Sequence, residues 1–155
     1  MFKISSGLQY HLMATGSLIT ALADSVIKIY GSDVSLAAAQ ALIPATANAA
    51  VGSALLLCTV SVDGNGTGVT FDPTPINGAI YKNAIELWKG INVASGYPSF
   101  YRIQQVSDDG TLSTVNIRAQ GSVGQIGTDL VIASAFMTQG QEQRVDSYTI
   151  GLPTE

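Results

Sequence analysis

The stretch that decides the fold is residues 85–105, with the sequence IELWKGINVASGYPSFYRIQQ. Side chains on either side of Gly96 and Pro98 alternate with a period of two, which predicts two β-strands with opposite faces. Glycine tolerates positive φ and proline fixes φ, so the residues between the two halves indicate a turn. We therefore predict a central β-hairpin in which Trp88, the single tryptophan, is the largest core residue.

Strand-like segments recur through the rest of the chain, at residues 26–30, 54–62, 69–71, 80–83, 114–120, 130–137 and 143–152. Within 114–120 the alternation places Val115 on the inward face and Arg118 and Gln120 on the outward face. Residues 121–127 are expected to form a glycine-punctuated loop. About eight strands, separated by turn signals every eight to twelve residues, are typical of a sandwich or jelly roll. The predicted fold is therefore a mainly β, antiparallel β-sandwich or jelly-roll-like single domain.

The chain is predicted to consist of a short, partly helical N-terminal arm, residues 1–24, and a β-sandwich domain, residues 25–155. In the arm, leucines recur at a spacing of four after Ser6, the expected N-cap, and the helical pattern breaks at Gly16. The arm either covers an open end of the sandwich or reaches a neighbouring subunit. Residues 34–43 are rich in Ala, Leu and Gln and favour a further helical turn or two, which Pro44 ends.

The composition limits the partners of the protein. Charged residues make up 12% of the chain. This share is about half the ~25% usual in soluble domains, so we expect sister copies or other proteins to cover part of the surface. The net charge of −4 and the scattered lysines and arginines argue against nucleic acid, because phosphate backbones need clustered cations.

The sequence also bears on the compartment of the protein. No apolar run approaches the roughly 20 residues of a membrane span. The N-terminus has no uninterrupted apolar core and is a poor signal peptide. We therefore expect no membrane association and folding in the cytoplasm.

Three possible metal or thiol sites are better explained as structural features. Cys58 lies in an apolar strand and is expected to be core. His11 is the single histidine, whereas the usual histidine metal sites need more than one. Asp63 and Asn65 match the start of a calcium loop, but Thr74 stands where a bidentate glutamate is needed, so we predict a hairpin turn. No metal or cofactor is expected.

The only pairing that resembles a sugar site is Glu86 beside Trp88 on one strand face. A core position for Trp88 is the preferred interpretation. Nucleophile elbows, phosphate loops and dinucleotide fingerprints are absent from the sequence. We therefore predict no catalytic residues and a protein that is not an enzyme.

Several segments resemble a family of small virion proteins of tailed bacteriophages. The arm at residues 6–22 is similar to the family pattern SGL…LLATGSL…AL, and residues 29–31 match its I-Y-x-G strand. Residues 44–57 match P-x-x-A-x-A-A-x-G-x-x-L-L, and further similarity is found at residues 66–71, 97–103 and 120–130. The chain departs from the family pattern by an apparent insertion at residues 33–43, for which an inter-subunit contact is one interpretation.

The resemblance implies a capsid decoration (cement) protein, a compact β domain on the capsid surface that stabilises the shell of the major capsid protein. The expected partners are that protein and sister copies, as a dimer or trimer. Two alternatives stay open: a tail or head–tail junction structural protein, and a carbohydrate-binding β-sandwich module. The first is expected to associate with tails, and the second to lose sugar binding when an exposed aromatic residue is replaced.

Overall fold

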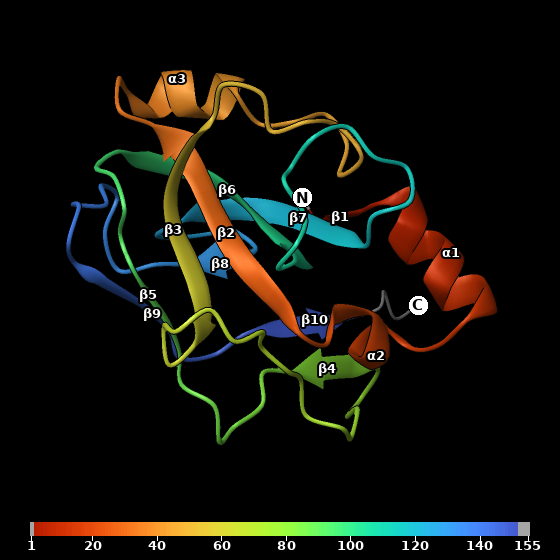
Figure 1. The fold of residues 1–155 in the computed structure, drawn as a ribbon. Coiled ribbons are helices and arrows are strands. Elements are labelled where there is room, and N and C mark those ends of the chain that lie inside the picture. Colours follow the sequence, from red (N-terminus) through yellow and green to blue (C-terminus); the bar gives the residue numbers. More distant parts are fainter. Residues whose placement is uncertain (1, 152–155) are drawn as a thin grey trace.

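Three long, mostly buried strands, β2, β3 and β6, form the centre of the main sheet (Figure 1). The structure is a computed structural model that describes residues 2–151. In these residues the main sheet has eight strands; seven are given in their order across the sheet and β8, which pairs with β7, is given last: β1 (Lys3–Ile4), β7 (Arg118–Gly124), β6 (Tyr97–Gln105), β2 (Ser25–Ser32), β3 (Leu55–Val62), β5 (Trp88–Ile91), β9 (Glu142–Val145), β8 (Leu130–Val131). A second sheet pairs β10 (Thr149–Gly151) with β4 (Ala79–Tyr81).

All strand pairs are antiparallel except β7 with β8. Strands from across the main sheet and from the second sheet contribute side chains to one connected core. Strand residues make up 39% of the chain and helical residues 13%, in a single compact domain. The prediction of a mainly β, antiparallel, single-domain fold is confirmed.

The predicted central hairpin is wrong, because its two strands do not pair with each other. β5 pairs with β3 and β9, whereas β6 pairs with β2 and β7. Pro98 belongs to β6 and lies opposite Gly31, next to a register shift that leaves Ser99 of β6 without a partner in β2. A Cβ at Gly31 would lie 1.9 Å from the Tyr97 carbonyl oxygen, so glycine permits this close crossing. The Gly-Tyr-Pro sequence at residues 96–98 thus marks the irregular start of β6 and not a turn.

Trp88 occupies the predicted core position, fully buried, with its indole N–H donating to Glu86 Oε2 at 2.7 Å. Its ring lies edge-on to Phe71, 5.4 Å between centroids, and 6.2 Å from Tyr148. Such aromatic pairs each contribute about 0.5–1.5 kcal/mol beyond their buried area. The cluster extends to Tyr101, and it joins β5 and β6 to the segment before β10.

Three short helices form where serine supplies the N-cap: α1 (Ser6–Ala14), α2 (Leu18–Leu22) and α3 (Leu36–Ala41). Ser5, not the predicted Ser6, caps α1, since its hydroxyl accepts a hydrogen bond from the Leu8 N–H at 3.1 Å. The break at Gly16 and the helical turns after residue 34 were predicted correctly. Leu8 and Leu22 are fully buried in the core, so α1 and α2 pack against the domain of their own chain.

The face assignments around β7 are the second error. Arg118 and Gln120 were predicted to face outward, but both are buried, whereas Val115, predicted inward, is 79% exposed. The glycines at 121 and 124, predicted to lie in a loop, belong to the strand. Residues 44–49 cover the polar face of β6 and β7 and bury it, so polar alternation on this strand does not indicate contact with solvent.

Candidate functional site

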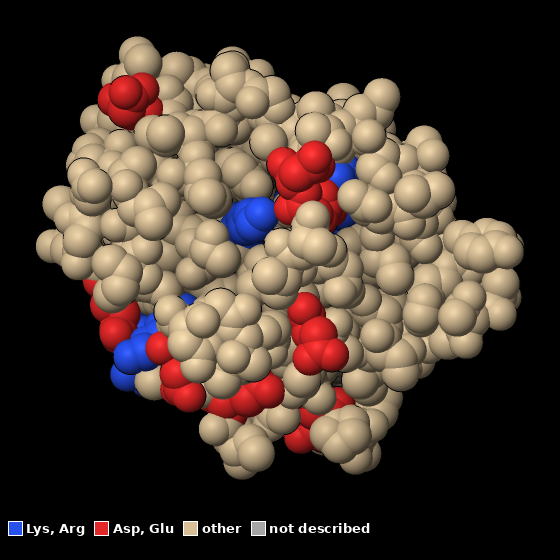
Figure 2. All heavy atoms as spheres, in the orientation of Figure 1, with Lys and Arg blue, Asp and Glu red and all other residues tan. Residues whose placement is uncertain are grey.

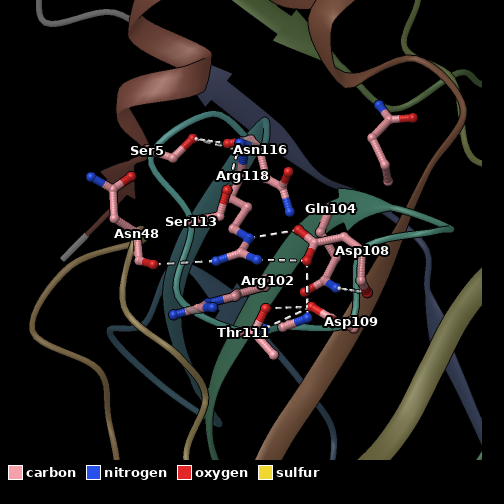
Figure 3. Close-up of polar contacts among 12 residues, drawn as sticks. Ser5, Asn48, Arg102, Gln104, Asp108, Asp109, Thr111, Ser113, Asn116 and Arg118 are labelled. Carbon is pink, nitrogen blue, oxygen red and sulfur yellow. Dashed lines mark hydrogen bonds and ion pairs between the residues drawn. The ribbon is translucent and has the colours of Figure 1, made fainter.

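A buried polar cluster lies on β6 and β7 beneath residues 44–49 (Figure 3). Arg118 donates from Nε and Nη2 to the two carboxylate oxygens of Asp108, at 2.5 and 2.6 Å. The side chains are 0% and 2% exposed. Arg102 from β6 lies beside them, and its Nε donates to Gln120 Oε1 at 2.9 Å. This arrangement is a two-pronged, charge-assisted contact that is shielded from solvent.

The cluster holds the covering segment through its backbone carbonyls, which lack partners within a strand or helix of their own. Four side chains donate to these oxygens: Arg102 to Ala49 at 2.7 Å, Gln120 to Pro44 at 2.9 Å, Lys3 to Ala45 at 3.0 Å, and Arg118 to Asn48 at 3.4 Å. Buried carbonyl groups require such donors. The cluster therefore attaches residues 44–49 to the sheet.

The charges of the cluster suit this structural role. Burial alone would raise the pKa of Asp108, but the hydrogen bonds and positive charge of Arg118, with the Gly110 N–H, hold that pKa below its usual value. Burial, and then repulsion by Arg118, lowers the pKa of Arg102 to about 10. A carboxylate that is ionised and fully hydrogen-bonded is a poor proton donor, so the geometry supports anchoring and not acid–base chemistry.

A separate feature reaches the surface: an open groove of about 1090 Å³ between β8 and β9. Its base consists of buried side chains of the core, including Leu130, Ile132, Met137 and Tyr148. Its walls come from the turn after β7, the segment after β8, and the run through β9. Among the wall residues are Gln125, Phe136, Gln141, Glu142, Gln143 and Arg144. We call this feature the amide groove.

Two ion pairs involve side chains that line the amide groove. Lys89 Nζ lies 3.2 Å from Glu142 Oε2, and Arg144 Nη2 lies 3.3 Å from Asp146 Oδ1. Both pairs are partly exposed and contribute little to stability. The groove therefore presents amides and one exposed aromatic ring, and its described lining carries three acidic side chains, Asp129, Glu142 and Asp146, beside one basic side chain, Arg144.

A smaller cavity of about 180 Å³ adjoins the groove and shares the lining residues Asp129, Tyr148 and Thr149 with it. In its wall the hydroxyl groups of Tyr101 and Tyr148 lie 2.5 Å apart. Burial raises the pKa of both phenols, so both remain protonated at neutral pH. One hydroxyl donates to the other, and both residues line the cavity.

Cys58 and His11 have the structural roles expected from the sequence. Cys58 is fully buried in β3, where burial raises the pKa of its thiol to about 12. His11 lies on α1 with its Nε2 3.3 Å from Thr20 Oγ1 on α2. The core position predicted for Cys58 is confirmed.

Residues 63–66 form the predicted hairpin turn, since Val62 bridges Thr67 across it. The side chain of Asn65 accepts from the Thr67 N–H at 2.9 Å, so this oxygen stabilises the turn. Among the described residues, no three His, Cys, Asp or Glu side chains gather into a metal-binding group.

The sugar site considered at Glu86 and Trp88 does not form. Trp88 is fully buried, and the Glu86 carboxylate accepts from Trp88, from the Thr70 N–H at 2.9 Å and from the Thr70 hydroxyl at 2.5 Å. The amide groove was missed, although the run QGQEQR at residues 139–144 was a visible signal. Amides so dense beside a short strand mark a polar surface, but only the fold places Gln125 and Phe136 opposite them.

The outer surface carries few charges, and Figure 2 shows small acidic and basic groups separated by wide uncharged areas. Large apolar side chains are exposed in the molecule's surface. On α1, Tyr10 is 71% exposed and Met13 is 88% exposed, and near α3 Val34 is 76% exposed. Among the described residues, no helix is long and apolar enough to cross a membrane.

Comparison of the chain with protein-family models, with curated proteins and with solved structures found no match.

Proposed function

We propose that this protein is a non-enzymatic structural protein of a phage virion, a capsid decoration protein that binds the shell formed by the major capsid protein. The observation that carries the proposal is a weakly charged surface on which a rigidly attached helix, α1, exposes large apolar side chains. Exposed apolar patches on small domains commonly mark protein–protein contacts. The protein would be made in the host cytoplasm and reside on the capsid surface, beside sister copies.

α1 is suited to binding because it is fixed before a partner arrives. Ser5 caps it, Leu8 anchors it in the core, and a Cβ at Gly7 would lie 2.3 Å from the Val115 carbonyl oxygen. Such close packing holds the outward residues, Tyr10 among them, in one orientation. Preorganisation lowers the entropic cost of association.

The mechanism would be mass action. A decoration protein that binds the assembled shell, and not its dissociated subunits, stabilises assembly by RT ln(1 + [L]/Kd) at each site, about 2.7 kcal/mol when the free concentration is a hundred times Kd. Because a capsid has many equivalent sites, a modest contribution at each one becomes a large increase in shell stability. No chemical step is required of the protein.

The test is co-sedimentation with expanded capsids of the same phage, quantified as copies per capsid. Saturation at a symmetry-related number, together with greater resistance of the shell to heat, is the expected result. Replacing Tyr10 and Met13 together by alanine should abolish binding. The control is Ile85→Ala, which removes a side chain that is 93% exposed but lies outside α1, and it should leave binding unchanged. All three side chains are exposed, so these variants keep the core intact.

Deletion of the arm is a poor alternative, because it would remove the β1 pairing with β7 and the buried Leu8. Failure to bind heads would overturn the proposal, and capture by isolated tails would then assign the protein to the tail or head–tail junction class. Binding that survives the loss of both Tyr10 and Met13 would show that α1 is not the contact. Sedimentation velocity of the free protein would determine whether sister copies form a dimer or trimer.

A further inference from the structure

We propose that the amide groove between β8 and β9 binds a neutral oligosaccharide. This activity is separate from the capsid contact proposed for α1 and does not depend on it. The groove is a gap in the curled sheet: β9 is the last strand in the order of the main sheet, and β8 pairs with β7. In the described part of the chain no strand pairing joins the two, and a concavity remains between them.

The size of the groove suits several sugar rings. Ligand sites in proteins usually have volumes between roughly 300 and roughly 1000 Å³. The groove, at about 1090 Å³, is slightly larger than that range. The groove is partly open to solvent, so a chain longer than the groove could extend beyond it. An extended polymer is therefore a better match than a compact metabolite.

The polar chemistry of the walls matches sugar hydroxyl groups. Each hydroxyl both donates and accepts, and a glutamine amide offers a donor NH₂ and an acceptor oxygen together. Gln141 has no hydrogen-bonding partner for its side chain within residues 2–151. Gln125 uses its amide nitrogen on the Ala133 carbonyl at 3.1 Å, which orients its oxygen. Gln143 completes a set of three glutamine amides around one groove.

The aromatic chemistry matches the apolar face of a sugar ring. Phe136 is 39% exposed in the groove wall, and its ring packs edge-on against Tyr97 with 4.9 Å between centroids. The hydroxyl of Ser134 donates to the Phe136 carbonyl at 2.7 Å and accepts from its N–H at 3.3 Å, which fixes the backbone. A rigid, partly exposed ring is a platform on which the C–H face of a pyranose can pack.

The charges favour a neutral ligand over an anionic one or a peptide strand. Because Glu142 pairs with Lys89 and Arg144 pairs with Asp146, no cluster of cations is available among the described residues of the groove for uronates or phosphates. The edge of β9 carries Glu142 and Arg144, and charged side chains on an edge strand oppose addition of another strand. A peptide strand is therefore a less favoured occupant of the groove than a neutral oligosaccharide.

The test uses calorimetric titration with four soluble probes: maltohexaose, cellohexaose, chitohexaose and, as an anionic comparison, hexagalacturonate. We expect at least one neutral probe to bind with Kd in the range of about 0.01–1 mM and the anionic probe not to bind. Phe136→Ala and Gln141→Ala should each weaken binding by about tenfold. The matched controls on α1, Tyr10→Ala and Gln9→Ala, replace an exposed aromatic and an exposed amide and should leave Kd unchanged.

Circular dichroism of each variant separates loss of binding from loss of folding, and Gln141→Ala removes only an exposed side chain. A second experiment compares binding of the free hexamer with binding of the corresponding insoluble polysaccharide. Tighter binding to the polysaccharide identifies a surface glycan as the natural ligand. Equal binding identifies a soluble oligosaccharide. The proposal is overturned if no neutral probe binds at about 5 mM, if hexagalacturonate binds best, or if Phe136→Ala and Gln141→Ala both bind like the wild type.

Discussion

Replacing Asp108 by alanine should destabilise the protein more than any exposed charge substitution. The change removes the carboxylate that pairs with Arg118 and leaves a guanidinium at 0% exposure with no compensating charge. Arg102 is fully buried in the same cluster, so two cations would then repel each other without an anion between them. The hydrogen bond from the Gly110 N–H at 2.9 Å would also be lost.

Removing one partner of a buried ion pair costs about 3–5 kcal/mol, and the second guanidinium places this case toward the upper end. Because domains of this size have total stabilities of about 5–15 kcal/mol, the variant would lose a large fraction of the free energy of unfolding. With a urea m-value of about 1–3 kcal/mol/M, the midpoint should fall by more than about 1 M. Fluorescence of the buried Trp88 reports the transition, with circular dichroism as a second probe.

The matched control is Asp146→Ala, since Asp146 pairs with Arg144 at 3.3 Å but its side chain is 80% exposed. Solvent screening limits that loss to about 1 kcal/mol or less. Asp108→Asn keeps the shape and should cost less than Asp108→Ala, because an amide oxygen can still accept from Arg118. Equal losses for Asp108→Ala and Asp146→Ala would refute the assignment of the cluster as the anchor of residues 44–49.

The same pair predicts an acid dependence. The pKa of Asp108 is lower in the folded than in the unfolded protein, so the unfolded state takes up the proton first. The stability contributed by the Asp108–Arg118 pair is therefore fully present above the pKa of Asp108 in the unfolded chain, about 4, and is lost as the pH falls toward the pKa in the folded protein. Urea midpoints measured across this interval should decline more steeply for the wild type than for Asp108→Ala.

Three further predictions use single positions. Burial raises the pKa of Tyr101 and Tyr148. The stability that these two tyrosines contribute is therefore fully present below about pH 10 and is lost as the pH rises. Tyrosinate absorbance and tryptophan fluorescence should then change together in alkali. Cys58, whose pKa burial raises to about 12, should resist a thiol reagent at neutral pH until urea unfolds the protein. Gly7→Ala should lower stability by about 1–3 kcal/mol in urea titrations, because the new Cβ meets backbone. Gln9→Ala, the control on the same helix, should change stability by about 0.5 kcal/mol or less.

The sequence predicted element types well because these depend on local signals. The strand at β2 and the helix ended by Pro44 follow from periodicity and propensity within a few residues. The core position of Trp88 follows from its size and its strand context. None of these predictions required knowledge of which strands pair.

Pairing and the direction of polar side chains could not be predicted in the same way. The pattern around Gly96 and Pro98 is the same for a hairpin as for an irregular strand start opposite Gly31, and only contacts distant in sequence separate the two. Arg118 and Gln120 alternate as solvent-facing residues do, but they are buried because residues 44–49 supply carbonyl oxygens above them. Burial of a polar residue depends on its partner, and that partner lies far away in the chain.

The two proposed binding surfaces are compatible with each other because they lie on different sides of the domain. In Figure 1, α1 projects at the right of the view, whereas β9, which forms one wall of the amide groove, lies at the left. A protein attached through α1 would therefore leave the groove uncovered by the same contact. The two sets of alanine variants should act independently: loss of Tyr10 and Met13 should affect binding to capsids alone, and loss of Phe136 and Gln141 should affect binding to sugar alone. A single variant that abolished both activities without unfolding the domain would show that one shared surface carries them.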